Sequence, residues 1–427
     1  MKISVVGTGY VGTVTAACFA ELGHDVICVD IDSRKVDQIN AGIPPIYEEG
    51  LPELLKKHAG KRMRATCDYD FAVMNSDVSF ICVGTPSDHH GNIDLSTVKS
   101  AGAALGDSLR SKISYHVITV KSTVVPETTE KVVQPIIEEH SGKRRDEFGM
   151  AMNPEFLREG KAVHDFMNPD KIVVGSIDKR SGDIVASLYS GIKCEVTRTN
   201  LRTAEMIKYA NNAFLATKIS FSNEIGNICK GLGIDTYEVM KAVGRDFRIG
   251  PYFLNSGAGF GGSCFPKDVK AIIGKARETG YEPHLLETVI EVNERQPGRM
   301  VILLKDRLGS IKGKKIAVLG LAFKNDTDDI RESRAINVIR ELLDSGAEVS
   351  AYDPMANENM RKIFSNIEYH TSAAGALRGA DAGLIMTEWD EFRSLDKEFE
   401  VMKNRLVIDG RHMLAPGKDI NYVGLCW

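Results

Sequence analysis

The sequence predicts an α/β protein with two Rossmann-like doubly wound domains, joined by a helical middle domain with a long connecting helix. Three observations support this fold class. Short apolar runs alternate with helix-like segments at both ends of the chain, as they do where helices cover both faces of a parallel sheet. Between these two regions the pattern changes to long helices. The length of 427 residues exceeds what one ordinary hydrophobic core occupies.

The first α/β region spans residues 1–197. A helix is expected at 12–22, because this segment is rich in alanine and ends at Gly23, a residue that suits a helix C-cap. Strands are expected where short apolar runs occur, at 3–6, 26–29, 78–83, 116–120, 149–152 and 171–174.

The helical middle region spans residues 198–298. Its expected helices are 201–232 and 285–295, with a glycine-rich loop at 257–262 between them. The long apolar face of 201–232 suggests a homodimer or a higher homo-oligomer.

The second α/β region spans residues 299–427. It opens with a strand at 315–320, continues through a helix at 333–345 and returns as a strand at 348–352, with further strands at 383–386 and 406–408. Since this pattern repeats that of the first region, we expect the active site in a cleft between the two outer domains.

Composition narrows the class of protein. The chain is 43% hydrophobic and 26% charged with a net charge of -4, which argues against nucleic acid or a membrane as a partner. No signal peptide or membrane-spanning run is apparent, so a cytoplasmic location is expected. Eight cysteines without a CxxC pair are expected to be reduced, and the histidines lack ligand spacing, so we predict no metal site.

A glycine motif after the first strand predicts a dinucleotide site. Gly7 permits a tight turn, Gly9 lets the backbone approach a pyrophosphate, and Gly12 allows close packing of helix and strand. Asp30 ends the next strand, where a carboxylate accepts hydrogen bonds from ribose hydroxyls and repels a 2′-phosphate. NAD is therefore expected rather than NADP. Lys35 lies near the ribose or is a solvated helix charge.

The second α/β region has a weaker fingerprint, Gly320-Leu321-Ala322-Phe323-Lys324, which lacks a third glycine. Two interpretations are open: a second nucleotide site, or a duplicated fold without a ligand.

A thiol within a glycine-rich loop is the strongest chemical signal. Cys264 follows several glycines and precedes the charged pair Lys267 and Asp268. Glycines allow close approach of a ligand, and a nearby cation favours the nucleophilic thiolate. A buried apolar cysteine is the alternative, but the flanking glycines and the charged pair favour the nucleophile.

Further polar residues lie on a helix and at strand ends. Glu205, Lys208 and Asn212 share one face of the helix 201–232, although a solvated polar face would give the same pattern. The segments 121–123 and 153–159 each follow a strand, where α/β folds place ligand-binding loops.

These motifs together resemble the UDP-glucose 6-dehydrogenase family, within the wider UDP-glucose/GDP-mannose dehydrogenases. The resemblance covers nearly the whole chain in the family's order. The matching segments are GTGYVG at 7–12, VGTPS at 83–87, KSTVVPET at 121–128, NPEFLREG at 153–160, EMIKYANNAFLATKISFSNE at 205–224, FLNSGAGFGGSCFPKD at 253–268 and GLAFKNDTDDIRESRA at 320–335.

The resemblance implies a four-electron oxidation of UDP-glucose to UDP-glucuronate with NAD, through a thiohemiacetal and a thioester on Cys264. It implies that Lys208 and Asn212 hold the oxyanion and a catalytic water, and that Asp268 assists proton transfer. Thr123 and Glu155 match residues that order this water. The cofactor set that it implies is Gly7, Gly9, Tyr10, Val11, Gly12, Asp30, Lys35, Thr85, Thr123, Glu159, Lys267 and Arg331. The substrate set is Glu155, Phe156, Leu157, Arg158, Glu159, Lys208, Asn212, Tyr252, Phe253, Leu254, Asn255, Ser256, Gly261 and Lys324.

Two alternatives to this function stay open. GDP-mannose and UDP-N-acetylmannosamine dehydrogenases share the same scheme, so the sugar is less strongly indicated than the reaction. A non-catalytic nucleotide sensor on the same scaffold is an alternative of another class. A sensor would be expected to lose Cys264, Lys208 or Asp268, and all three are present.

Overall fold

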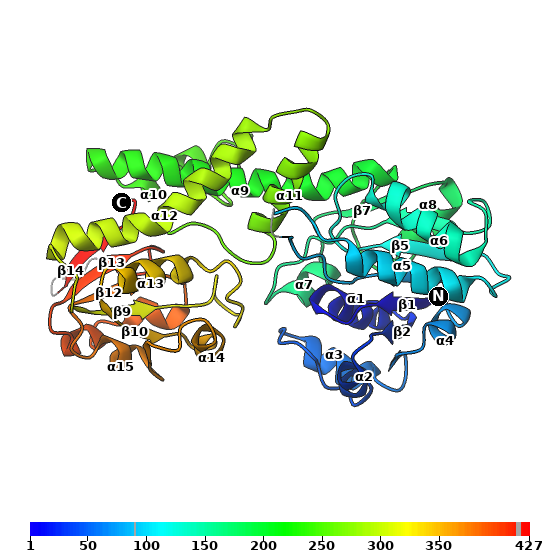
Figure 1. Ribbon diagram of the computed structural model, residues 1–427, viewed down its shortest axis with the longest axis horizontal. Coiled ribbons are helices and arrows are strands. Elements are labelled where there is room, and N and C mark those ends of the chain that lie inside the picture. Colours follow the sequence, from blue (N-terminus) through cyan, green and yellow to red (C-terminus); the bar gives the residue numbers. More distant parts are fainter. Residues whose placement is uncertain (89–90, 416–419) are drawn as a thin grey trace. The chain divides into compact units, whose positions relative to one another are not determined.

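The computed structural model describes residues 1–88, 91–415 and 420–427. The chain divides into two compact units, Met1–Asn211 and Asn212–Trp427, and each contains one β-sheet (Figure 1). The long helix α9 (Leu201–Leu232) begins in the first unit and continues into the second. Within the described ranges no helix has the length and apolar character needed to cross a membrane.

The first unit is built on an eight-stranded sheet in the order β3-β2-β1-β4-β5-β6-β7-β8. All neighbouring strands are parallel except β6 and β7, which pair antiparallel. The strand order reverses direction between β1 and β4, which is where doubly wound folds bind their ligands. The strands are β1 (Lys2–Val6), β2 (Asp25–Val29), β3 (Met63–Thr66), β4 (Val78–Ile81), β5 (Val117–Val120), β6 (Gly149–Met152), β7 (Ile172–Ser176) and β8 (Val196–Thr199).

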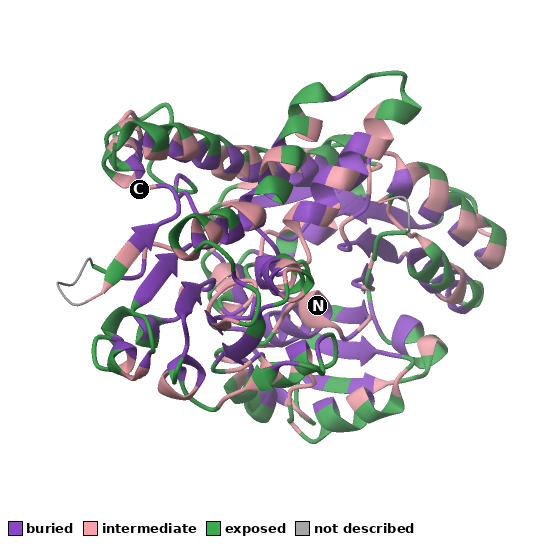
Figure 2. Cartoon of the chain, turned by 60° about the vertical axis from the view of Figure 1, so that its left-hand side comes forward, coloured by how far each residue is buried: buried purple, intermediate pink, exposed green. Residues whose placement is uncertain are grey.

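Helices cover both faces of this sheet. On one face Val117 of β5 belongs to a core formed with α1 (Tyr10–Glu21), α2 (Ser33–Asn40), α3 (Leu51–His58), α7 (Ala162–Met167) and α8 (Lys179–Ser187). On the other face Ile118 belongs to a core formed with α4 (Tyr69–Met74), α5 (Ser96–Leu109), α6 (Gln134–Ser141) and the first turn of α9. Because successive side chains of a strand point to opposite faces, the central strands are buried along their whole length, as the purple strands of Figure 2 show.

The second unit contains a six-stranded parallel sheet in the order β11-β10-β9-β12-β13-β14. Helices α13 (Arg334–Asp344), α14 (Asn357–Arg361) and α15 (Ala373–Leu377) connect its strands. The prediction of a second Rossmann-like sheet is therefore confirmed. The strands are β9 (Lys315–Leu319), β10 (Glu348–Tyr352), β11 (Glu368–Tyr369), β12 (Ala382–Ile385), β13 (Leu406–Asp409) and β14 (Asn421–Gly424).

The remaining helices of the second unit are α10 (Thr236–Val243), α11 (Phe265–Glu278) and α12 (His284–Leu308). Side chains from α9, α11 and α12 pack around Phe260 in a small core of their own. The sequence indicated that the second long helix of the middle region ends near residue 295, but this helix, α12, continues through Pro297. Met300, Val301 and Leu304 are fully buried against the sheet, and this burial holds the helix together beyond the proline.

Four strands were not expected from the sequence: β3, β8, β11 and β14. All four lie at the edges of the two sheets. An edge strand has a neighbour on one side only, so it is short or partly exposed and lacks a continuous apolar run. The structure confirms the predicted central strands. They could be predicted because burial on both faces requires a continuous apolar run in the sequence.

Candidate functional site

A tight turn between β1 and α1 carries the predicted cofactor glycines. Gly7 has φ +92°, and a Cβ there would lie 3.0 Å from the backbone of Cys82. A Cβ on Gly12 would lie 1.8 Å from the Gly7 carbonyl oxygen, so only glycine fits at that position. Beside Gly9, which precedes α1, no described atom other than those of its two chain neighbours lies within 4 Å of where a Cβ would stand. The turn thus has an open approach to the N-terminus of a helix, which suits a phosphate group.

Asp30 follows β2 and lies beside this turn. Its Oδ2 accepts hydrogen bonds from the Thr8 N–H at 2.7 Å and the Thr8 hydroxyl at 2.5 Å, and its Oδ1 accepts from the Asp32 N–H at 3.0 Å. Lys35 Nζ lies 3.9 Å from Oδ2. Burial raises the pKa of the Asp30 carboxyl, but these hydrogen bonds and the Lys35 charge outweigh burial and hold the pKa below its ordinary value. Asp30 is therefore an ionised acceptor at the end of β2.

Two other loops of the first unit carry predicted cofactor residues. The Thr85 hydroxyl, after β4, donates to the Thr123 carbonyl oxygen, after β5, at 3.0 Å. The structure therefore brings these two predicted residues together at neighbouring strand ends. Tyr10 of α1, next to the half-buried Val11, accepts a hydrogen bond from the Gly160 N–H at 2.9 Å through its hydroxyl oxygen.

A buried ion pair joins Glu155, after β6, to Lys208 on α9. Lys208 Nζ donates to Glu155 Oε1 at 2.8 Å, and both side chains are nearly fully buried. The Leu157 N–H donates to Glu155 Oε2 at 2.6 Å. Burial raises the pKa of Glu155, but the charge and hydrogen bond of Lys208 outweigh it, so the pKa is lowered overall. A carboxylate beside an ammonium group is equipped to hold a proton, a water or a developing oxyanion.

Glu205 does not join this pair, although it shares a helix face with Lys208. Its carboxylate accepts hydrogen bonds from the Glu127 N–H at 2.7 Å and the Thr129 N–H at 2.8 Å. It thus fixes the backbone that follows Thr123. Two residues on one polar helix face therefore bind different segments: Glu205 binds the backbone at 127–129, and Lys208 binds Glu155.

Residues 156–159 complete the loop after β6. The Phe156 ring lies beneath two ammonium groups, 4.5 Å from Lys171 Nζ and 5.4 Å from Lys208 Nζ. Leu157 packs against the core, and Glu159 is half-buried. Arg158 is exposed, and its guanidinium donates two hydrogen bonds to Asp165 within 2.9 Å. A role for Arg158 at the substrate would need this pair to open.

In the second unit, Cys264 lies at the N-terminus of α11, and Asp268 lies in the first turn of this helix. Asp268 is 1% exposed and accepts hydrogen bonds from Asn212 Nδ2 and Lys267 Nζ, each at 2.7 Å. The Cys264 sulfur lies 3.6 Å from the Ser263 hydroxyl oxygen and is half-exposed. Because a helix N-terminus stabilises a thiolate, this arrangement suits a nucleophile with a carboxylate one turn away.

Three amide side chains that the sequence interpretation missed hold the loop before Cys264. Asn223 Oδ1 accepts from the Gly257 N–H at 2.7 Å, and Gln296 Nε2 donates to the Gly257 carbonyl at 2.9 Å. Asn293 bonds both the N–H and the carbonyl of Phe260. Asn293 and Gln296 lie on the buried face of α12 with Val289 and Met300. Polar residues at apolar positions of a helical repeat were the signal that could have found them.

The predicted substrate residues differ in exposure. Tyr252, Phe253 and Asn255 are exposed, whereas Leu254 and Ser256 are buried. Phe253 has φ +62°, an uncommon backbone conformation for a residue other than glycine.

The loop after β9 lies against the glycine-rich loop. A Cβ on Gly261 would lie 2.2 Å from the Glu332 carbonyl oxygen, so glycine is needed for this approach. The Gly262 N–H donates to the Arg331 carbonyl at 2.9 Å. The Arg331 guanidinium pairs with Asp329, and the half-buried Lys324 donates to the Asn325 carbonyl at 3.3 Å.

A fourth residue that was missed, Arg411, also supports the glycine-rich loop. Its Nη2 donates to the Gly259 carbonyl at 3.1 Å and its Nε to the Met386 carbonyl at 2.8 Å. A lone arginine after a strand has no sequence signal that distinguishes it from a surface charge.

The weak second fingerprint adopts the same turn as the first. Gly320 has φ +93°, and Asp353 after β10 occupies the position that Asp30 has after β2. Asp353, however, accepts five hydrogen bonds, two from the backbone after Gly320, one from Trp389 and two from its own following turn. Because a carboxylate has about four lone-pair sites, Asp353 has no capacity left for ribose hydroxyls. This unit does not repeat the cofactor site of the first.

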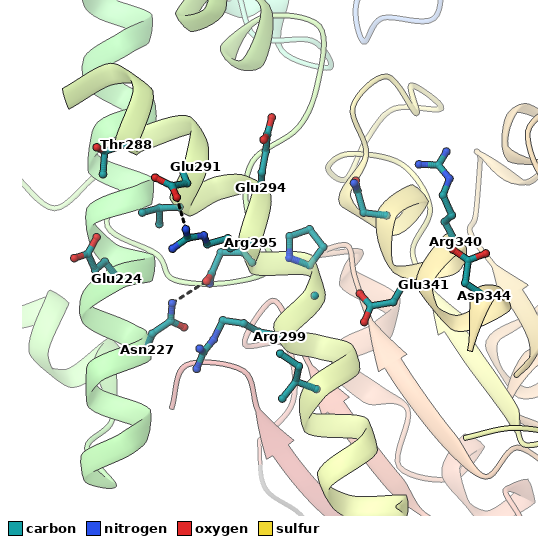
Figure 3. Close-up of a pocket in the computed structure, with 16 residues that line it drawn as sticks. Glu224, Asn227, Thr288, Glu291, Glu294, Arg295, Arg299, Arg340, Glu341 and Asp344 are labelled. Carbon is teal, nitrogen blue, oxygen red and sulfur yellow. Dashed lines mark hydrogen bonds and ion pairs between the residues drawn. The ribbon is translucent and has the colours of Figure 1, made fainter. Parts of the chain in front are cut away.

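An open groove of about 840 Å³ lies over α9, α12 and α13 in the second unit (Figure 3). It contains none of the predicted site residues. Both acidic and basic side chains line it, and Arg295 pairs with Glu291. Gln296, which supports Gly257, also lines the groove and accepts a hydrogen bond from Asn227 at 2.8 Å.

Comparison with protein families finds three matching models, each belonging to the UDP-glucose/GDP-mannose dehydrogenases. The NAD binding domain of that family matches residues 1–193, the central domain matches 202–295 and the UDP binding domain matches 317–416. The first match confirms NAD as the cofactor, which fits the glycine turn and Asp30.

Individual relatives resemble the chain along its full length. UDP-glucose 6-dehydrogenase AglM of Haloferax volcanii is 52% identical and covers 100% of both chains. UDP-glucose 6-dehydrogenase TuaD of Bacillus subtilis is 46% identical over 97% of this chain and 90% of its own. The solved structure of a UDP-glucose dehydrogenase from Pyrobaculum islandicum matches with a TM-score of 0.94 and 42% identity, covering 100% of this chain and 98% of its own.

Proposed function

The chain belongs to the UDP-glucose/GDP-mannose dehydrogenase family, and from this membership we propose that it oxidises UDP-glucose to UDP-glucuronate with NAD as the oxidant. The observation that carries this proposal is Cys264, half-exposed at the N-terminus of α11 with the buried Asp268 one turn away. The two UDP-glucose 6-dehydrogenases that resemble the chain over nearly its whole length support the sugar.

The first unit holds the cofactor in this proposal. Gly9, with its open side at the helix N-terminus, would hold the pyrophosphate, and Asp30, with Lys35 beside it, would accept hydrogen bonds from the adenosine ribose. When bound, NAD accepts one hydride in each of the two oxidations. The cofactor set further includes Gly7, Tyr10, Val11, Gly12, Thr85, Thr123, Glu159, Lys267 and Arg331.

The reaction proceeds through covalent intermediates on Cys264. The C6 alcohol of the sugar loses a hydride and a proton and becomes an aldehyde. The Cys264 thiolate adds to this aldehyde, and the resulting thiohemiacetal loses a second hydride and a proton to give a thioester. Water cleaves the C–S bond and leaves the carboxylate and the free thiol. The covalent bond retains the reactive aldehyde between the two oxidations.

Polar groups in both units support these steps. Lys208 and Asn212 stabilise the oxyanion and hold the catalytic water, while Asp268 moves the protons. The hydrogen bond from Asn212 to Asp268 and the ion pair of Lys208 with Glu155 support these assignments. Thr123 orders the water, and Glu155 acts as acid and base in the hydrolysis.

The sugar nucleotide is assigned to the set of residues that the family resemblance indicates. Their exposure in the loops after β6, α10 and β9 supports this assignment for part of the set. The substrate set is Glu155, Phe156, Leu157, Arg158, Glu159, Lys208, Asn212, Tyr252, Phe253, Leu254, Asn255, Ser256, Gly261 and Lys324. The division into domains 1–197, 198–298 and 299–427 belongs to the same proposal, and the ranges of the three family models support it.

The protein works as a homodimer that is paired through α9. Phe214, Phe221 and Ile228 recur every seven residues on this helix and are 65%, 53% and 54% exposed. Such a stripe buries apolar area against a second copy of itself. We place the enzyme in the cytoplasm, where its eight cysteines would stay reduced.

A substrate panel tests the function. The purified protein is mixed with NAD and UDP-glucose, GDP-mannose or UDP-N-acetylmannosamine, and NADH is followed at 340 nm. We expect two NADH for each UDP-glucose consumed. If no sugar nucleotide yields NADH, the nucleotide-sensor alternative is favoured. If NADH forms only with GDP-mannose or UDP-N-acetylmannosamine, that sugar nucleotide and not UDP-glucose is the substrate.

A further inference from the structure

Lys121 is a buried lysine at the end of β5 that the reaction above does not use. It is 3% exposed, and its Nζ donates to Asn153 Oδ1 at 3.0 Å. The Asn153 carbonyl oxygen and the Tyr189 hydroxyl oxygen lie 3.5 and 3.4 Å from the same nitrogen. The Tyr189 hydroxyl in turn donates to Asn153 Oδ1 at 2.5 Å. Burying an ammonium group costs free energy unless hydrogen bonds or an opposite charge compensate for it.

The surroundings of Lys121 contain little that offsets this charge. Within residues 1–88, 91–415 and 420–427, no carboxylate lies within ion-pair distance of its Nζ. Burial lowers the pKa of Lys121 to about 8, against the neighbouring Cys82 and Glu155, which raise it. Cys18 of α1 and Lys208 of α9 also face it, and the Phe166 ring of α7 lies 5.8 Å away. Glu155 is the carboxylate among these neighbours, and Lys121 and Glu155 each favour the charged form of the other.

The link to Glu155 is direct along the chain. Asn153, which Lys121 holds, lies two residues before Glu155 in the loop after β6. Asn153 is also fixed by its N–H to the Val120 carbonyl at 2.9 Å and by its Nδ2 to the Val173 carbonyl at 2.8 Å. The neighbouring strands β5 and β7 therefore anchor the start of this loop, and Lys121 adds the only charge among those anchors within the described residues.

We infer that Lys121 is a positioning residue for the proposed reaction: its ammonium group anchors Asn153 and, with Lys208, keeps the Glu155 carboxylate ionised. This inference rests on the proposed function, because it assigns a task to Lys121 through Glu155. Lys208 is ion-paired with Glu155, and Lys121 is held to the same loop through Asn153, so two ammonium groups accompany one carboxylate in this cluster. Such a cluster favours binding of an anionic intermediate near Glu155 and opposes protonation of the Glu155 carboxylate.

The test replaces the charge and leaves the fold. Lys121→Met removes the ammonium group but keeps a similar volume, and Tyr189 still donates to Asn153. Lys121→Arg retains the charge. Lys112→Met is the matched control, because Lys112 is 5% exposed in the same unit and, among the residues that the structure describes, its Nζ bonds only the backbone carbonyls of Val73 and Ser76. Lys112 precedes β5, whereas Lys121 follows it.

The readout is the pH dependence of kcat with saturating UDP-glucose and NAD, beside thermal unfolding of each variant. We expect Lys121→Met to move the acid limb of the profile upward by about one pH unit, since Glu155 loses one of its two cationic neighbours. Lys121→Arg should leave this limb within a few tenths of a pH unit of the wild type. Lys112→Met should lower the unfolding temperature but leave the acid limb of the pH profile at its wild-type position. If Lys121→Met does not fold by circular dichroism, Lys121→Gln takes its place.

Glu155→Gln separates this inference from the proposed function. If Glu155→Gln keeps the wild-type acid limb, then Glu155 has no role in the reaction and that part of the proposed function fails. If Glu155→Gln abolishes the limb but Lys121→Met leaves it in place, the role of Lys121 is overturned and the function stands. In the double variant Lys121→Met/Glu155→Gln, we expect no further change of the profile.

Discussion

The side-chain amide of Asn293 pairs with both polar groups of Phe260. Its Oδ1 accepts from the Phe260 N–H at 2.7 Å, and its Nδ2 donates to the Phe260 carbonyl at 3.0 Å. Asn293 is 1% exposed on α12, four residues before Pro297. One buried amide therefore satisfies both backbone groups of Phe260, as a neighbouring strand would, and this loop leads to Cys264.

Asn293→Leu should destabilise the second unit. Leucine has a similar volume but leaves the Phe260 N–H and carbonyl without partners, which costs about 3 kcal/mol for the two groups. We expect a lower unfolding temperature and a raised KM for UDP-glucose. Asn293→Asp keeps the acceptor and should show a smaller loss. An unchanged unfolding temperature in Asn293→Leu would mean that the loop does not depend on this amide.

Cys264→Ser should leave little or no net formation of UDP-glucuronate, because the serine hydroxyl lacks the sulfur atom that forms the thioester. Product is measured by chromatography over many turnovers. Cys67→Ser is the matched control, since Cys67 is exposed and lies at the end of β3, and it should retain wild-type rates. Wild-type turnover in Cys264→Ser would remove the covalent mechanism.

Asp30 should set the preference for NAD over NADP. In Asp30→Asn the charge that repels a 2′-phosphate is lost, and the ribose hydroxyls lose a charged acceptor worth about 1.5–3 kcal/mol. We expect kcat/KM for NAD to fall at least about tenfold, while kcat/KM for NADP does not fall. The ratio is measured at 340 nm with both cofactors. Equal kcat/KM for both in the wild type would contradict this role.

Phe221→Glu should dissociate the proposed dimer, because it places a charge in the middle of the apolar stripe on α9. The molar mass is measured by light scattering after size exclusion. Glu224→Gln, three residues further on the same helix and also exposed, should retain the mass of the wild type. If the wild type itself has the mass of one chain, the stripe is not a dimer interface.

His116 should make the first unit less stable in mild acid. Its Nδ1 lies 3.1 Å from the Ser76 carbonyl oxygen and so carries the proton, while its Nε2 accepts from the Ser79 hydroxyl at 2.8 Å. Burial, with Lys112 nearby, lowers the pKa of His116 from 6.5 to about 3.

The direction of this pH dependence follows from proton binding. Between pH 6.5 and about 3 the unfolded chain binds a proton at His116 that the folded protein does not, so stability falls as the pH falls through this window. From pH 7 to pH 5 the loss is about 2 kcal/mol. Urea unfolding at the two pH values measures it, and in His116→Gln the difference should shrink by this amount. An equal difference in both proteins would show that His116 does not contribute.

The central strands, the long helix α9 and the cofactor turn were accessible from sequence alone. Strands such as β5, buried on both faces, leave continuous apolar runs, and the glycines at 7 and 12 leave a spaced motif, because each needs its own residue type for a local reason. The edge strand β8 carries no such signal, since none of its four residues is buried. The chemistry of Cys264 was visible only beside its neighbours in the motif.

Which side chain meets which was decided by tertiary packing. Glu205, Lys208 and Asn212 have the same spacing on one helix, yet Glu205 binds the backbone near Thr129, Lys208 binds Glu155 and Asn212 binds Asp268. Helical spacing is a local property and places residues on a face. The partner of each residue comes from segments 53 to 76 positions away, and only the packing of those segments brings the two groups within hydrogen-bond distance.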